Sequence, residues 1–149
     1  RPGRAVERAG GLGSRRLNLL LDTHIWLWSH IQPERLGKRV AAALTDERNR
    51  LWLSPISIWE FLLLVESGRV RIRSGVAPAD WIQTALERAP MQDAPLTRDV
   101  ALRSREVTVD HKDPADRFLA ATACVHELTL VTADERLLRG KGFRTLANR

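Results

Sequence analysis

The chain has 149 residues, enough for one domain with a sizeable core. Apolar residues make up 44% and charged residues 28%, which is typical of a globular protein, and no apolar run reaches the roughly 18 residues of a membrane span. The single cysteine, Cys124, excludes an internal disulfide, a cysteine-built zinc site and an iron–sulfur cluster. Because residues 1–16 also lack a secretory signal, a reducing cytoplasm is the expected location.

The net charge of +6 is unevenly distributed along the chain. Residues 1–16 hold five arginines and one glutamate, a net of +4, which leaves +2 for the rest. With their glycines and no apolar periodicity, residues 1–16 are expected to form a flexible basic arm. Clustered arginine favours a nucleic-acid partner, but a solvated tail has the same composition. Charge alone leaves both interpretations open.

Residues 17–149 are expected to form one α/β domain. Short apolar runs predict strands at 17–21, 51–53, 91–94, 128–132 and 143–146, with a brief extended piece at 70–72. Periodic apolar residues and capping residues predict helices at 23–29, 33–46, 55–65, 78–89, 97–105, 113–127 and 134–138. Strands separated by helices indicate a parallel sheet of four to five strands covered by helices on both faces, a three-layer sandwich. In such folds, functional sites gather at the carboxyl ends of the strands.

Two acidic residues stand out in the first half of the chain. Asp22 directly follows the strand 17–21, where it is either an N-cap or a site residue. Glu60 lies in a helix whose positions three and four residues away are Ile56, Ser57, Leu63 and Leu64, none of them basic. A carboxylate among such neighbours loses hydration, which favours a functional role over a structural one.

Two further acids occupy comparable places in the second half. Asp113 and Pro114 begin the helix 113–127, and Asp116 follows at its third position, where an acid also suits the helix dipole. Asp134 follows the strand 128–132 by two residues and is equally suited to capping. Each of these positions taken singly has an ordinary structural explanation.

The joint placement of Asp22, Glu60, Asp116 and Asp134 carries more weight. Two follow strands at their carboxyl ends, and two lie in the early part of helices that start at that same edge. Two carboxylates about 4 Å apart repel by roughly 4 kcal/mol at an effective dielectric of 20, so a cluster needs protons or a cation. An all-oxygen set suits Mg²⁺ or Mn²⁺, ions that promote cleavage of phosphodiesters.

Four stretches, in this order and spacing, resemble the PIN-domain ribonuclease toxins of VapC type. They are LLLDTH (19–24), SPISIWE (54–60) with GRV (68–70), DPADRFLAATA (113–123) and LVTAD (130–134). The resemblance spans about residues 17–146 and implies a PIN-like fold for 17–149. The basic arm, residues 1–16, departs from the family, whose members begin close to the first strand.

The resemblance also implies roles for individual residues. Asp22, Glu60 and Asp116 would be the three core acids of the catalytic site, and Asp134 the more variable fourth. Asp22 and Asp116 would bind the metal directly, with Glu60 and Asp134 acting through waters or a second ion. The hydroxyls of Thr23 and Thr132 would support the carboxylates or a metal-bound water. Asp113 with Arg117 would be a helix cap and a charge partner, and His24 would be structural.

The function implied is that of a Mg²⁺-dependent endoribonuclease, the toxin of a type II toxin–antitoxin pair. Its substrate would be structured RNA, such as tRNA or ribosomal RNA, and its partners a cognate antitoxin and a second copy in a homodimer. An alternative is a non-catalytic RNA- or partner-binding module on the same fold. A third, a phosphatase with an aspartyl nucleophile, is disfavoured because a second acid two residues after Asp22 and a G-x-x-x-x-G-K loop are both missing.

Overall fold

The computed structural model describes residues 15–110 and 113–149, so the predicted arm lies outside the described residues except for Arg15 and Arg16. Five strands are present in this part: β1 (Asn18–Leu21), β2 (Arg50–Leu53), β3 (Gln92–Asp93), β4 (Thr129–Thr132) and β5 (Arg144–Ala147). The helices are α2 (Thr23–Ile31), the short 3₁₀ helix η1 (Pro33–Arg35), α3 (Lys38–Thr45), α4 (Pro55–Glu66), α5 (Pro78–Arg88), α6 (Arg98–Arg103), α7 (Pro114–Val125) and α8 (Glu135–Leu138).

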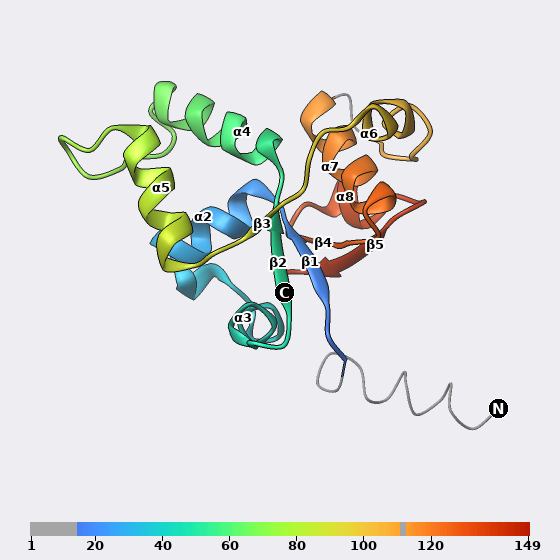
Figure 1. Cartoon of the computed structure of the whole chain (residues 1–149), viewed down its shortest axis with the longest axis horizontal. Helices are drawn as coiled ribbons and strands as arrows, with labels where there is room; N and C mark the ends of the chain where they lie inside the picture. The colour runs from blue at the N-terminus through green and yellow to red at the C-terminus, as the bar shows by residue number, and fades with distance from the viewer. Residues whose placement is uncertain (1–14, 111–112) are drawn as a thin grey trace.

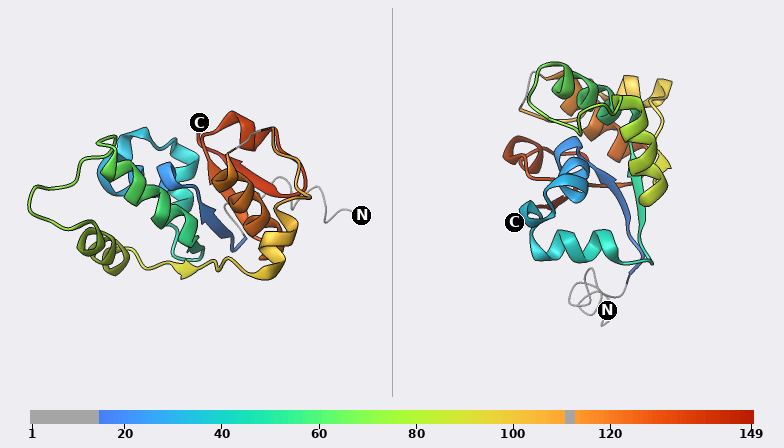
Figure 2. Two further views of the ribbon diagram at one scale, coloured as in Figure 1. Left: turned by 90° about the horizontal axis from the view of Figure 1, so that it is seen from above. Right: turned by 90° about the vertical axis from the view of Figure 1, so that its left-hand side faces the viewer.

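The strands form one sheet in the order β3-β2-β1-β4-β5, and all neighbouring pairs are parallel. Figures 1 and 2 show α2, α4 and α5 on one side of the strands and α6, α7 and α8 on the other. The central strand β1 serves both layers, because Leu19 and Leu21 pack into one apolar cluster and Leu20 into the other. The predicted α/β/α sandwich with a parallel sheet of four to five strands is thereby confirmed.

Residues with side-chain oxygens begin the helices at the carboxyl edge of the sheet. Asp22 accepts from the amide of Thr23 before α2, and Asp113 accepts from Ala115 before α7. Asp134 does the same for Arg136 before α8, and Ser54 for Ile56 before α4. Since the side chains of these residues satisfy the free amides of a first helical turn, they also fix the point at which the chain leaves the sheet.

One sequence prediction of the fold needs correction. The predicted helix 33–46 is divided into η1 and α3, because Leu36 has an extended backbone and Gly37 begins a new helix. The amide of Gly37 donates to Oδ1 of Asn148, and a Cβ at Gly37 would clash with the carbonyl oxygen of Arg149. The predicted extended piece 70–72 joins none of the five strands of the sheet.

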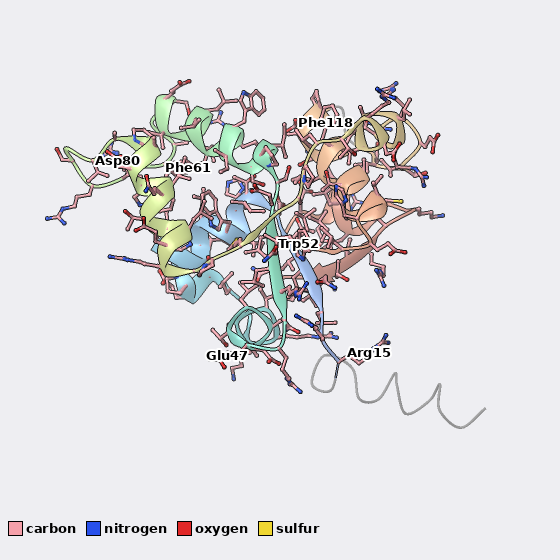
Figure 3. The ribbon with its side chains drawn as sticks, viewed as in Figure 1. Arg15, Glu47, Trp52, Phe61, Asp80 and Phe118 are labelled. Atoms are coloured by element: carbon pink, nitrogen blue, oxygen red, sulfur yellow. The ribbon has the colours of Figure 1, made fainter. Side chains whose placement is uncertain are left out.

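Aromatic side chains fill the layer formed by α2, α4 and α5. Trp26 and Phe61 are fully buried, and Trp81 stacks on Phe61 with ring centroids 4.8 Å apart. Figure 3 shows Phe61 among these helices. Trp59, by contrast, is 51% exposed. Within the described ranges, no helix is long and apolar enough to cross a membrane.

Candidate metal centre

The ends of β1 and β4 meet through a buried hydroxyl. These strands are neighbours in the sheet, so Asp22 and Thr132 lie side by side although 110 residues separate them. The Thr132 hydroxyl donates to Oδ2 of Asp22 at 2.6 Å and accepts from the amide of Asp134 at 3.0 Å. One threonine therefore fixes the positions of two of the four predicted acids.

A second threonine reaches the acid on α4. Thr23, buried in the first turn of α2, donates from its hydroxyl to Oε1 of Glu60 at 2.8 Å, while its amide donates to Oδ1 of Asp22 at 2.7 Å. Thr23 thus binds the carboxylate of the residue before it and that of Glu60, which lies 37 residues further along the chain. Thr23 and Thr132, which were predicted to support the acids, each donate a hydroxyl hydrogen bond to a carboxylate.

Asp116 lies in the first turn of α7 and is 7% exposed. Its pKa is raised to about 8, most of all by burial and in addition by the charges of Asp22, Asp113, Asp134 and Glu60. Because these four charges all act on Asp116, the acids lie close enough together to form one cluster, which we call the carboxylate group. Asp113, expected to act only as a helix cap, adds its negative charge to this group.

The other acids respond to the same surroundings. Burial raises the pKa of Glu60 to about 7, with the charges of Asp22 and Asp113 acting in the same direction and the Thr23 hydroxyl opposing them. Burial also raises the pKa of Asp22, although hydrogen bonds from Thr132 and Thr23 favour its charged form. Groups that hold protons this strongly, close to one another, also suit a divalent cation, which relieves the same repulsion.

The carboxylate oxygens of the four acids fit a Mg²⁺ or Mn²⁺ ion that is bound by only a few protein ligands. The acids supply only oxygen, the atom that these hard ions prefer. In the described ranges, however, no three His, Cys, Asp or Glu side chains are close enough together to form a finished metal cage. Mg²⁺ characteristically keeps several waters and uses one or two carboxylates plus substrate phosphates. Ser57, one turn before Glu60, adds a buried hydroxyl that has no hydrogen-bond partner among the described residues.

Arg117 and His24 have roles different from those of the acids. The Arg117 guanidinium donates to the carbonyl oxygens of Ser104, Val107 and Val109 at 3.0–3.2 Å, so it holds the segment before α7, and its role as a charge partner stays a prediction. His24 is exposed, and its ring lies 5.8 Å from that of Trp28. Its positive form lowers the pKa of Asp22, against the larger effect of burial.

A groove of about 550 Å³ opens beside Glu60 and Asp113. Its lining includes Trp59 and Leu63, which are 51% and 43% exposed, together with Arg69. Sequence reasoning did not single out this surface. The available signal was the spacing of Trp59 and Leu63, one helical turn apart on α4 and next to Glu60.

Comparison with known proteins identifies the class to which this fold and site belong. The model of the PIN domain family matches residues 19–142, which include all four acids and both threonines. The chain therefore belongs to the PIN domain family.

Within that family, the chain is similar to VapC proteins. It is 31% identical to Ribonuclease VapC22 of Mycobacterium tuberculosis (strain ATCC 25618 / H37Rv) over 120 residues, 80% of this chain and 88% of that protein. Its fold matches a chain of VapBC2 from Rickettsia felis bound to a promoter DNA fragment, with a TM-score of 0.64, 13% identity and coverage of 89% and 100%. It also matches DNA-bound VapBC from Salmonella typhimurium, with a TM-score of 0.60, 18% identity and coverage of 88% and 98%.

Proposed function

We propose that this protein is a Mg²⁺-dependent endoribonuclease and the toxin of a type II toxin–antitoxin pair. The observation that carries the proposal is the carboxylate group of Asp22, Glu60, Asp116 and Asp134, gathered at one edge of the sheet. The relative that is 31% identical to this protein is named a ribonuclease, and the solved structures with a similar fold are VapBC complexes. Mn²⁺ is an alternative ion, since it also prefers oxygen ligands.

The protein groups have distinct tasks in this proposal. Asp22 and Asp116 hold the cation, and Glu60 and Asp134 orient waters around it. A bound divalent ion supplies a Lewis acid that offsets charge on the scissile phosphate and lowers the pKa of a water. Thr23 and Thr132 keep Glu60 and Asp22 in place through their hydroxyl hydrogen bonds. Burial, and in addition the crowding of like charges, raises the carboxyl pKa values of Glu60 and Asp116, and the same crowding makes the group attractive to a cation.

The proposal extends to the partners of the protein. The substrate is structured RNA such as tRNA or ribosomal RNA, cleaved in the cytoplasm. A cognate antitoxin covers the groove beside Glu60, where the exposed Trp59 and Leu63 offer apolar contact. The toxin itself forms a homodimer, which light scattering of the purified protein measures directly.

The decisive experiment is cleavage of total cellular RNA by full-length protein free of antitoxin, with Mg²⁺, Mn²⁺ or EDTA. Asp116→Asn removes the charge of a buried acid, and Asp80→Asn makes the same change in the first turn of α5. We expect discrete fragments that require metal, persist with Asp80→Asn and disappear with Asp116→Asn. Metal-independent cleavage, or equal cleavage by the two variants, contradicts the proposal. Absence of cleavage together with tight RNA binding favours the non-catalytic module.

A further inference from the structure

A second groove, which we call the basic groove, lies next to the one beside Glu60. It has a volume of about 500 Å³, and its lining includes Arg35, Arg69, Arg71, His24 and Trp28. None of its lining residues, all of them in the described ranges, is acidic. The groove beside Glu60, in contrast, is lined by Glu60, Glu66 and Asp113. The two grooves therefore differ sharply in charge.

The two grooves adjoin each other. Leu64 and Arg69 line both of them, so the groove beside Glu60 and the basic groove meet at these two residues. Leu64 packs against the apolar core with part of its side chain. A nucleic acid with one phosphate beside Glu60 can therefore place its neighbouring phosphates near Arg69 and Arg71.

The turn after α4 gives Arg69 and Arg71 their positions. Gly68 has a φ of +76°, and the amides of Gly68 and Arg69 donate to the carbonyl oxygens of Val65 and Leu64. This hydrogen-bond pattern closes α4 and reverses the chain, which a residue with a Cβ at Gly68 would resist. Beyond the turn, Val70 packs against the core, while Arg69 and Arg71 are exposed on either side of it.

The residues from α2 and η1 present flat groups to the basic groove. The guanidinium carbon of Arg35 lies 4.5 Å from the ring centroid of Trp28, and the His24 ring contacts the same tryptophan. Guanidinium planes and aromatic rings are the surfaces on which unpaired bases of single-stranded RNA stack. Arginines next to such a platform provide the contacts that the backbone phosphates need.

We propose that the basic groove is a binding site for the single-stranded segment of RNA adjacent to the scissile phosphate. Phosphates of that segment contact Arg69 and Arg71, and one base extends the stack formed by Trp28 and Arg35. This inference rests on the proposed ribonuclease function and adds to it the route of the substrate across the surface.

Binding tests use full-length Asp116→Asn protein and a short fluorescein-labelled oligouridylate in EDTA. Arg71→Glu and Arg35→Glu change exposed side chains of the groove, and Arg50→Glu is a matched control at the amino end of β2, on the opposite edge of the sheet. We expect each groove variant to weaken binding at least about tenfold. Arg71→Glu, which loses a phosphate contact, should also lower the slope of log K against log salt by about 0.7. An equal effect of Arg50→Glu overturns the proposal.

Stacking is tested separately with Arg35→Lys. Lysine keeps the charge but lacks the planar guanidinium. We expect binding to weaken at least about fivefold with an unchanged salt slope, the loss typical of one base stack. Unchanged affinity overturns the assignment of Arg35 as a stacking surface.

Cleavage of total cellular RNA in Mg²⁺ separates the two proposals, using the same substitutions in protein that retains Asp116. If the parent protein cleaves and Arg71→Glu cleaves as well as Arg50→Glu, the basic groove is not on the substrate route. If the parent protein itself does not cleave, this result contradicts the proposed ribonuclease function and not the binding site in the basic groove, which the oligouridylate experiment tests. A groove that instead receives an antitoxin peptide leaves oligouridylate affinity unchanged in Arg71→Glu, which also overturns the proposal.

Discussion

The hydroxyl of Thr132 and the carboxylate of Asp22 form a 2.6 Å hydrogen bond that joins the ends of β4 and β1. Both side chains are buried, and the same hydroxyl accepts from the amide of Asp134. The spatial relation between two of the four acids thus depends on one oxygen atom.

We expect Thr132→Val to destabilise the protein by about 1–3 kcal/mol, because it leaves a buried carboxylate and an amide without their partner. Valine keeps the shape of the side chain, so the effect reports on the hydroxyl. Thr129→Val, on the same strand, is the control and is expected to change stability by less than about 0.5 kcal/mol. Urea unfolding measures both, and equal values would contradict the role given to the hydroxyl.

Removal of the charge at Asp116 is expected to stabilise the metal-free protein. Its pKa is raised to about 8 mainly by burial, so ionisation opposes folding. Asparagine resembles the protonated acid, and we expect Asp116→Asn to raise Tm by at least about 3 °C at pH 8 and to change it little at pH 4. Asp80→Asn serves as the exposed control. A lower Tm of Asp116→Asn at pH 8 would indicate a capping role instead.

The stability of the metal-free protein is expected to fall as pH rises from about 4 to about 8. Glu60 and Asp116, with pKa values raised to about 7 and about 8, hold more protons in the folded chain than in the unfolded chain over this interval. Stability therefore decreases with increasing pH and levels off above the folded pKa values. Thermal unfolding in EDTA across this range measures the slope, and a rising Tm would contradict the assigned shifts.

Magnesium is expected to reverse this loss. Cations bind the deprotonated carboxylates, so protons compete with the ion and the rise in Tm on adding Mg²⁺ should be larger at pH 8 than at pH 5. Asp116→Asn should remove most of this rise, and Asp80→Asn should keep it. Calorimetric titration at both pH values provides an independent measure, and equal affinity at the two would argue against carboxylate ligation.

Arg117→Lys tests the segment before α7. A single ammonium cannot reproduce three hydrogen bonds to carbonyl oxygens of residues 104, 107 and 109. We expect a loss of about 1.5–3 kcal/mol, compared with less than about 0.5 kcal/mol for Arg98→Lys on the exposed surface of α6. Similar losses for the two variants would show that the guanidinium contacts contribute little.

The sequence was sufficient for the order of the elements and for the convergence of the acids, because both follow from local patterns and from the geometry of a parallel sheet. The spacing of Leu36 and Val40 suggested one continuous helix, however, and no local signal reveals that Gly37 meets Asn148 and Arg149. The partners of Arg117 and the junction of the two grooves at Arg69 are likewise tertiary contacts. Distances between side chains that are remote in sequence were not predictable from single residues.

The separation of Asp22 and Thr132 along the chain has a consequence for protein synthesis. Asp22 leaves the ribosome early during synthesis. Its buried partner Thr132 is the last residue of β4, the strand beside β1, and is made 110 residues later. Asp134 and its helix follow still later. The carboxylate group consequently assembles only when nearly the whole domain has been made, so a nascent or prematurely terminated chain lacks it.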